Sequence, residues 1–210
     1  MNETKARDEI ARLSRSLYER GYSVGSAGNI SLRLEDGYLI TPTNSCLGFL
    51  DPARISKLDA QGRHVAGDRP SKEVFLHTAF YETRSVAGAV VHLHSTYATA
   101  ISCMQGVEPE DCIKPLTPYV VMRVGKVALV PYFRPGDERG GTLIRALNGR
   151  YAAVLLANHG PVVSGKDILS TVYAAEELEE TAKLLVTLGD RPVNYLSDEN
   201  VTELHRIFGE

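Results

Sequence analysis

The sequence lacks an excess of charge of either sign. Its 23 Lys and Arg residues stand against 26 Asp and Glu residues, which gives a formal net charge of −3. Proteins that bind nucleic acids or anionic membrane surfaces usually carry a strong basic field. We therefore expect no nucleic-acid partner and no membrane partner.

Cysteine is scarce. The three cysteines are Cys46, Cys103 and Cys112, and their spacing matches neither a zinc-binding pattern nor a Cys-x-x-Cys motif. An odd number without a pairing pattern predicts free thiols, which are typical of a reducing compartment. Structural zinc sites are usually closed and rich in cysteine, so the sequence argues against a purely structural metal.

Long hydrophobic runs are also missing. A helix that spans a bilayer needs about 20 apolar residues, and the longest apolar runs here have only a few. The amino-terminal segment carries charges throughout and has no apolar centre, which argues against a signal peptide. These absences predict a cytoplasmic protein.

The composition that remains is that of an ordinary globular protein. The chain has 210 residues, of which 43% are hydrophobic and 23% are charged. It contains no internal repeat, low-complexity segment or linker. A chain of this length can bury about 70% of the surface of its unfolded form. We predict a single domain over residues 1–210.

Hydrophobic periodicity divides the chain into helices and strands. Helical spacing predicts a helix opened by Pro70 and Ser71 and further helices over residues 4–20, 96–104, 167–188 and 198–208. Alternating and β-branched runs predict strands over residues 30–34, 38–40, 87–93, 127–131 and 151–157. Interleaved helices and strands favour a layered α/β domain. Residues 41–70 are rich in Pro, Gly, Asp and Asn, and predict a functional loop with a short strand or helix inside it.

Histidines follow two of the predicted buried strands. His92 and His94 lie two residues apart at a strand end, so the two-residue period places both rings on the same face. His159 follows a second apolar strand and precedes a Gly-Pro turn. Each histidine alone could be a structural side chain, but the three together are the ligand type of a catalytic zinc that keeps positions open.

Two further residues are candidates for proton transfer. Glu73 is predicted on the first turn of the helix that follows Pro70. It could be a carboxylate favoured by the helix dipole, a general acid or base, or a fourth metal ligand that substrate displaces. Tyr119 could be a proton donor or a buried structural tyrosine.

Small and hydroxyl-rich loops indicate a phosphate pocket. These loops are Gly25–Ser31 and Thr41–Ser45, while Ser71 and Lys72 lie at a helix N-terminus that favours an anion. Lys72 would add a point charge; alternatively, each segment is only a turn or a cap. The chain has no Walker or Rossmann pattern, so the sequence gives no support for nucleotide binding. An acidic stretch at residues 176–180 is interpreted as a solvated face or a contact with a neighbouring subunit.

Several motifs, in this order and spacing, resemble those of the class II aldolase/adducin family. The motifs are Gly28-Asn29-Ile-Ser31, Thr41-Pro-Thr43, Pro70-Ser-Lys-Glu73, Val91-His92-Leu-His94-Ser95 and Asn158-His159-Gly160. The resemblance covers about residues 17–188. It implies a three-layer α/β/α sandwich with a mixed, mostly antiparallel central sheet, usually assembled as a tetramer.

The resemblance also implies roles for particular residues. One Zn²⁺ per subunit, or another divalent metal, would bind to His92, His94 and His159, with Glu73 as a further ligand and proton-transfer group. A sugar phosphate would be bound by Gly28, Asn29, Thr43, Asn44, Ser71 and Lys72. Tyr119 would reach into the active site of a neighbouring subunit, so the active sites would lie at subunit interfaces.

A second set of motifs is similar to the 3-oxo-tetronate 4-phosphate decarboxylase branch of that family. The set consists of Asn44–Gly48, Leu50–Pro52, Ser71–Glu73, Thr117–Arg123, Tyr132–Asp137 and Gly189–Pro192. This similarity implies decarboxylation to dihydroxyacetone phosphate through a zinc-stabilised enediolate. Fuculose-phosphate aldolases carry a second serine at the position of Lys72 and a glycine at the position of Asn44. The side chain of Asn44 must therefore keep the geometry of its loop. The 4-epimerases carry an aspartate at the position of Glu73.

The residues leave alternatives open. The alternatives are a sugar-phosphate aldolase, which would use the same enediolate, and a 4-epimerase. A non-catalytic adducin-like interaction module would use the same fold without needing the metal ligands. Glu73 and Tyr119 are both candidates for delivering the proton. Lys72, Arg123 and Arg134 are candidates for holding the departing carboxylate.

Overall fold

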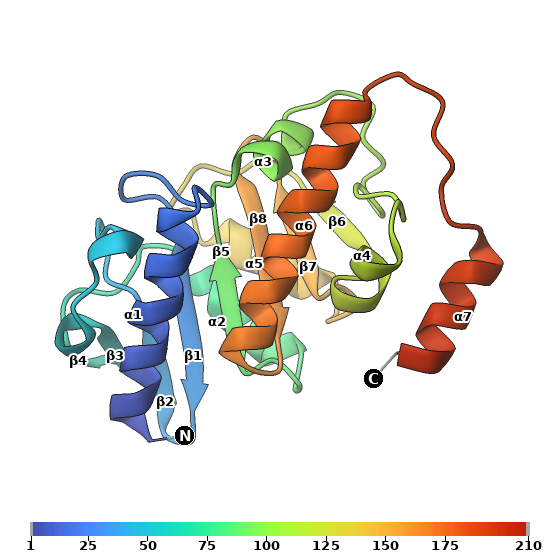
Figure 1. Ribbon diagram of the computed structural model, residues 1–210. Coiled ribbons are helices and arrows are strands. Elements are labelled where there is room, and N and C mark those ends of the chain that lie inside the picture. The colour runs from blue at the N-terminus through green and yellow to red at the C-terminus, as the bar shows by residue number, and fades with distance from the viewer. Residues whose placement is uncertain (1, 209–210) are drawn as a thin grey trace.

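One mixed sheet forms the centre of the protein (Figure 1). The structure is a computed structural model that describes residues 2–208. The eight strands follow the order β4-β3-β2-β1-β5-β8-β7-β6. They are β1 (Asn29–Leu34), β2 (Gly37–Ile40), β3 (Ser56–Asp59), β4 (His64–Ala66), β5 (Ala89–His92), β6 (Val127–Val130), β7 (Ala153–Leu156) and β8 (Gly160–Gly165). All neighbouring pairs are antiparallel except β6 and β7, which confirms the mixed, mostly antiparallel sheet.

Helices cover both faces of this sheet. The α-helices are α1 (Glu3–Glu19), α2 (Val74–Thr83), α3 (Thr96–Ser102), α4 (Pro118–Arg123), α5 (Arg139–Ala146), α6 (Ile168–Leu188) and α7 (Asp198–Phe208). In Figure 1, α1 and α6 lie in front of the sheet and α2 and α5 behind it, which confirms the α/β/α layering. Across residues 2–208, none of the helices combines the length and apolar character that a membrane crossing requires.

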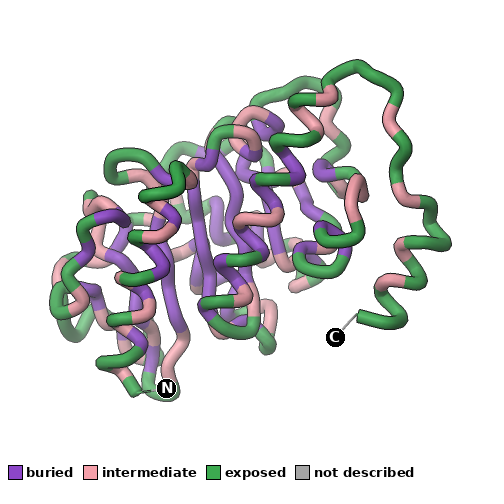
Figure 2. Tube along the Cα trace, viewed as in Figure 1, coloured by how far each residue is buried: buried purple, intermediate pink, exposed green. Residues whose placement is uncertain are grey.

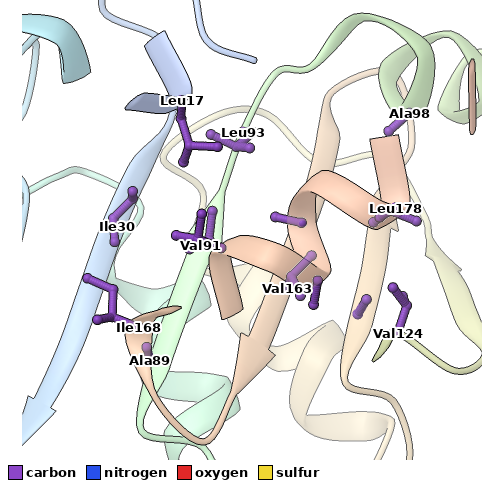
Figure 3. Close-up of a cluster of buried hydrophobic side chains, with 14 of the residues drawn as sticks. Leu17, Ile30, Ala89, Val91, Leu93, Ala98, Val124, Val163, Ile168 and Leu178 are labelled. Atoms are coloured by element: carbon purple, nitrogen blue, oxygen red, sulfur yellow. The ribbon is translucent and has the colours of Figure 1, made fainter. Parts of the chain in front are cut away.

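Two hydrophobic clusters fill the two interfaces between the layers. In β5, Val91 belongs to the cluster under α1 and α6, and its neighbour Val90 belongs to the cluster under α2. Leu155 and Val154 divide in the same way on β7. Successive strand side chains point to opposite faces, so a strand covered on both faces is apolar throughout. Figure 2 shows the resulting buried centre, and Figure 3 shows the first cluster in detail.

Several elements lie where hydrophobic periodicity gave no signal. Residues 41–70 contain β3, β4 and the short 3-10 helices η1 (Leu47–Phe49) and η2 (Pro52–Arg54). All three residues of β4 are exposed, so this strand carries no apolar alternation. Helix α5 includes two adjacent glycines, which are poor helix formers. The main-chain pairing and tertiary packing of these segments decide their structure.

The expected Gly-Pro turn after His159 is wrong. Gly160 and Pro161 are the first residues of β8, and the chain turns before them at residues 157–159. Pro161 is tolerated near the start of a strand because its missing N–H removes only one hydrogen bond of the ladder. Its carbonyl oxygen still accepts from the main-chain N–H of Leu93 at 3.1 Å. The β7–β8 hairpin therefore brings His159 next to the end of β5.

The interpretation of the acidic stretch as a solvated face is wrong for one residue. Glu179 of α6 is buried, and its two carboxylate oxygens accept from the main-chain N–H groups of Tyr97 and Ala98 at 2.8 Å each. These donors belong to the first turn of α3, where helical N–H groups have no partner within the helix. Glu179 thereby ties α6 to the helix that directly follows the segment carrying His94.

Candidate active site

Three histidine rings meet at one end of the sheet. His92 is the last residue of β5, His94 lies two residues beyond it, and His159 lies in the turn between β7 and β8. Because β5 and β8 are antiparallel, the end of β5 lies beside the start of β8, which directly follows His159. The Nε2 atom of His94 lies 3.2 Å from that of His92 and 3.1 Å from that of His159. The structure thus brings together the three histidines that the sequence analysis selected.

The buried ring of His92 has a defined tautomer. Its Nδ1 atom lies 2.8 Å from the carbonyl oxygen of Pro161. A carbonyl oxygen only accepts, so Nδ1 carries the hydrogen and Nε2 presents its lone pair to the other rings. Burial and the neighbouring rings of His159 and His94 lower the pKa of His92 well below its usual value. The ring is therefore neutral and ready to coordinate a cation.

Glu73 completes a four-residue group. Its Oε2 atom lies 3.4 Å from Nε2 of His92, and its Oε1 atom lies 3.4 Å from Nε2 of His159. One ligand atom from each of Glu73, His92, His94 and His159 lies within 4.8 Å of the others. Burial also lowers the pKa values of His94 and His159. Three neutral imidazoles and a carboxylate match the donor set that divalent transition metals prefer.

The backbone position of Glu73 differs from the expectation. Helix α2 begins at Val74, so Glu73 stands at the N-cap position just before the helix and not on its first turn. Its main-chain N–H donates to Oγ of Ser71 at 3.2 Å. The side chain is free of a capping role and extends toward the histidines.

A small cavity adjoins the four-residue group. Its volume is about 220 Å³. It is lined by all six residues that the sequence analysis selected for phosphate binding, namely Gly28, Asn29, Thr43, Asn44, Ser71 and Lys72. Glu73 and His94 line the same cavity. A ligand in this cavity would therefore touch the phosphate loops and the histidine cluster together.

Main-chain hydrogen bonds connect two of the loops around the cavity. The N–H of Thr43 donates to the carbonyl oxygen of Arg69 at 2.9 Å, and the N–H of Ser71 donates to that of Thr41 at 3.3 Å. Asn44 has a φ of 56°, in the left-handed region that only Gly, Asn and Asp adopt readily. Asparagine at this position therefore keeps a loop geometry that a glycine would also permit.

Gly28 allows its loop to pack against the metal-binding strand. Its φ is 81°, and a Cβ atom at this position would lie 2.8 Å from the carbonyl oxygen of His92. Any other residue would push the loop away from β5 or strain its backbone. The glycine therefore couples the position of the loop Gly25–Ser31 to that of the histidines.

Further residues that line the cavity are Ser26, Ala27, Pro42, Pro135 and Gly136. The first three lie within the loops Gly25–Ser31 and Thr41–Ser45, which the sequence already indicated as part of a phosphate pocket. The last two belong to the segment after β6, within the motif Tyr132–Asp137 that supported the resemblance. This motif indicated Pro135 and Gly136 in the sequence, because their side chains have no chemistry that would mark a site.

Two of the selected residues lie elsewhere. Tyr119 is on α4, with 56% of its surface exposed, and does not line the cavity. The guanidinium carbon of Arg123 lies 5.7 Å from the Tyr119 ring centroid. Arg123 lines a different cavity beside Gly165, at the opposite end of β8 from Gly160. Arg134 directly precedes two cavity-lining residues. Within one chain, the structure therefore separates Tyr119 and Arg123 from the histidine cluster.

Comparisons with known proteins agree with the family resemblance of the sequence. A family model described as the class II aldolase and adducin N-terminal domain matches residues 8–186. A 3-oxo-tetronate 4-phosphate decarboxylase from Pectobacterium atrosepticum is 54% identical over 204 residues, which cover 97% of this chain and 94% of that protein. An L-fuculose phosphate aldolase from Methanococcus maripaludis is 37% identical over 177 residues, which cover 84% of this chain and 93% of that protein.

The fold is also similar to that of a solved structure. The crystal structure of YgbL from Klebsiella pneumoniae superposes with a TM-score of 0.94. The two sequences are 51% identical, and the alignment covers 97% of this chain and 99% of that one. The decarboxylase relative is thus more similar to this chain than the aldolase relative is.

Proposed function

Because this chain belongs to the class II aldolase and adducin family, we propose that it is a metal-dependent carboxy-lyase acting on 3-oxo-tetronate 4-phosphate in carbohydrate metabolism. The observation that carries the proposal is the meeting of two groups at one cavity. Glu73 and His94 of the four-residue group line that cavity together with Lys72 and the phosphate loops. The 54% identity to a decarboxylase supports this substrate over that of the aldolase.

The metal site would be formed by His92, His94, His159 and Glu73. We propose Zn²⁺, one per subunit, because three imidazoles with a position open to substrate are a usual catalytic zinc donor set. A bound divalent cation would supply Lewis acidity that stabilises negative charge on the substrate oxygens. The hydrogen bond from Nδ1 of His92 to the Pro161 carbonyl already directs the lone pair of Nε2, and metal-binding histidines usually have such a partner on their other ring nitrogen.

The phosphate group would bind at the far side of the cavity from the histidines. Thr43 and Ser71 offer hydroxyl groups and Asn44 offers a side-chain amide around this cavity, and Lys72 adds a positive charge. Binding energy from this remote group positions the bond that breaks. Lys72 lines the cavity, and Arg134 directly precedes the lining residues Pro135 and Gly136. Either cation could also contact the carboxylate of the substrate.

The reaction breaks the bond between C1 and C2 of the substrate. Carbon dioxide leaves, and the electron pair of that bond stays on the C2–C3 unit. A proton then forms a bond to C2 and gives dihydroxyacetone phosphate. Glu73 lines the cavity and can deliver that proton once its carboxylate has taken one up from solvent. Tyr119 could do so only from a second copy of the chain.

The remaining proposals concern the whole protein. We propose that residues 1–210 act as a single domain, that the protein is cytoplasmic, and that it assembles as a homotetramer with active sites at subunit interfaces. The exposed position of Tyr119 supports the last point, because this side chain is free to contact a neighbour. Sedimentation velocity of the wild-type protein would test the assembly directly.

A decarboxylation assay tests the activity. Zinc-loaded protein receives 3-oxo-tetronate 4-phosphate, and dihydroxyacetone phosphate is measured by coupled NADH oxidation, with His94→Ala as the blank. We expect turnover that disappears in the variant. Zinc-loaded wild type without turnover would contradict the substrate assignment. Cleavage of L-fuculose 1-phosphate in a parallel assay would then identify an aldolase.

A further inference from the structure

A continuous row of buried side chains connects the back of the sheet to Glu73. Oη of Tyr81 lies 2.7 Å from Oγ of Ser31, which lies 2.7 Å from Nδ1 of His77. Nε2 of His77 lies 2.5 Å from Oδ1 of Asn29, and Nδ2 of Asn29 lies 3.0 Å from Oε2 of Glu73. Four hydrogen bonds therefore link α2 and β1 to the carboxylate of the candidate metal site.

The carboxylate at the Glu73 end fixes the direction of every bond. The Glu73 carboxylate only accepts, so the Asn29 amide must turn its NH₂ group toward it. The Asn29 carbonyl then faces His77 and only accepts, so Nε2 of His77 carries the hydrogen. Nδ1 of His77 is left as an acceptor for the Ser31 hydroxyl, and Ser31 in turn accepts from Tyr81. Reversing the amide would set its carbonyl oxygen against the Glu73 carboxylate and its NH₂ group against the Nε2–H of His77.

Burial makes this row rigid. Ser31 and His77 are each 1% exposed, Tyr81 is 4% exposed and Asn29 is 5% exposed. A buried polar group without its partner costs about 1–3 kcal/mol, so each member holds its neighbour in place. Burial also lowers the pKa of His77 to about 3, which keeps its ring neutral with one donor and one acceptor. An amide does not relay protons along such a row, so its role is to position groups.

We propose that Ser31 and His77 are positioning residues that lock the Asn29 amide, so that its NH₂ group holds the Glu73 carboxylate toward the three histidines. The proposal deepens the proposed function, because it assigns residues that prepare the metal site. Asn29 acts as the direct contact, since its carbonyl is committed to His77 and its NH₂ group to Glu73. Ser31 and His77 act through it without touching the metal ligands.

Three substitutions at position 77 and beside it test this role. His77→Phe fills similar space and removes both hydrogen bonds. His77→Gln can donate its amide N–H to Asn29 and accept from Ser31, so it is the conservative rescue. Thr78→Val, on the same helix, is the matched control, because the Thr78 hydroxyl bonds only to the carbonyl of Phe75 in its own helix. Ser31→Ala breaks the same row by a smaller change if His77→Phe does not fold.

The readouts are metal affinity and the tautomer of His77, both measured without substrate. We expect His77→Phe and Ser31→Ala to weaken Zn²⁺ binding by about 10–100-fold in competition titrations, as for other residues that orient metal ligands. His77→Gln should stay near the wild-type affinity, and Thr78→Val should match it. In wild-type protein, ¹⁵N NMR should show a protonated Nε2 and an unprotonated Nδ1 on His77.

Two results would overturn the proposal. One is a folded His77→Phe or Ser31→Ala protein that binds Zn²⁺ as tightly as the wild type. The other is a wild-type His77 ring protonated on Nδ1. A wild-type protein that binds Zn²⁺ but does not decarboxylate would contradict the proposed function alone, because neither readout depends on turnover.

Discussion

His92 and Pro161 are joined across two neighbouring strands: Nδ1 of the His92 ring donates to the carbonyl oxygen of Pro161 at 2.8 Å. The same oxygen accepts from the main-chain N–H of Leu93 at 3.1 Å. The Pro161 carbonyl oxygen therefore holds both the side chain of His92 and the main chain at Leu93. The sheet fixes the tautomer of a metal-binding histidine through a hydrogen bond that an ordinary strand pair provides.

Removing one ring of the cluster should abolish stable metal binding. His94→Ala keeps His92, His159 and Glu73. It removes the ring whose Nε2 lies 3.2 Å from Nε2 of His92 and 3.1 Å from Nε2 of His159. We expect the zinc content, measured by elemental analysis after dialysis, to fall from one ion per chain to near zero. His64→Ala, on the exposed strand β4, is the control and should keep its metal. Full zinc retention in His94→Ala would contradict the assigned ligand set.

The metal-free protein should lose stability as pH falls below about 6.5. The pKa of His77 is about 3 in the folded protein, against 6.5 for an unperturbed histidine. Between these two values the unfolded chain binds a proton that folded His77 does not, so the free energy of unfolding rises with pH there. One such group changes that free energy by about 1.4 kcal/mol per pH unit.

Urea unfolding of the metal-free protein at pH 7, 5.5 and 4.5 measures this dependence. His77→Gln carries no titrating ring at this position, so its stability should fall less steeply over the same range. His92, His94 and His159 also have lowered pKa values and would leave part of the slope in both proteins. Equal slopes in the two proteins would contradict the shifted pKa of His77.

Lys72 should contribute to substrate affinity. Its side chain is exposed at the edge of the cavity, beside Ser71 and Glu73. Lys72→Met keeps the length of the side chain and removes its charge, so we expect KM for the phosphorylated substrate to rise by about tenfold or more, equivalent to about 1.4 kcal/mol. Steady-state kinetics would measure this change. Lys5→Met, on the exposed surface of α1, should leave KM unchanged, and equal KM values for both variants would remove Lys72 from the binding site.

The left-handed backbone at Asn44 should tolerate glycine and reject β-branched residues. At a φ of 56°, the Cβ atom of an ordinary residue crowds the backbone. We expect Asn44→Gly to change the free energy of unfolding little, and Asn44→Val to lower it by about 1–2 kcal/mol. Thermal unfolding measures both. Two variants of equal stability would show that the loop relaxes out of this conformation.

Glu179 should stabilise the fold through α3. Its buried carboxylate accepts from two main-chain N–H groups, and Glu179→Ala leaves those donors without a partner. We expect a loss of about 1–3 kcal/mol in the free energy of unfolding. Glu180→Ala is the control, because Glu180 is exposed and surface changes usually stay within about 0.5 kcal/mol. A loss in Glu180→Ala as large as in Glu179→Ala would contradict the capping role.

The sequence by itself determined the elements with strong periodicity. Helices α1 and α6 and strands β5 and β7 lie close to their predicted positions, because long amphipathic and continuous apolar patterns permit few other structures. It also selected the members of the histidine cluster, since histidines that end buried strands stand out from their surroundings. The family motifs added the phosphate loops, whose small polar residues have no distinctive pattern of their own.

Only the tertiary structure decided how these pieces meet. Strand β8, which begins at Gly160 and Pro161, could not be inferred from local sequence, because its pairing with β5 and β7 overrides a dipeptide that usually marks a turn. Burial of Glu179 against α3 was hidden among exposed acidic neighbours. His77 lies within the helix predicted after Pro70, and its partners Asn29 and Ser31 lie far from it in the chain. Hydrogen bonds between distant segments form only in the packed sheet, so the local sequence pattern does not predict them.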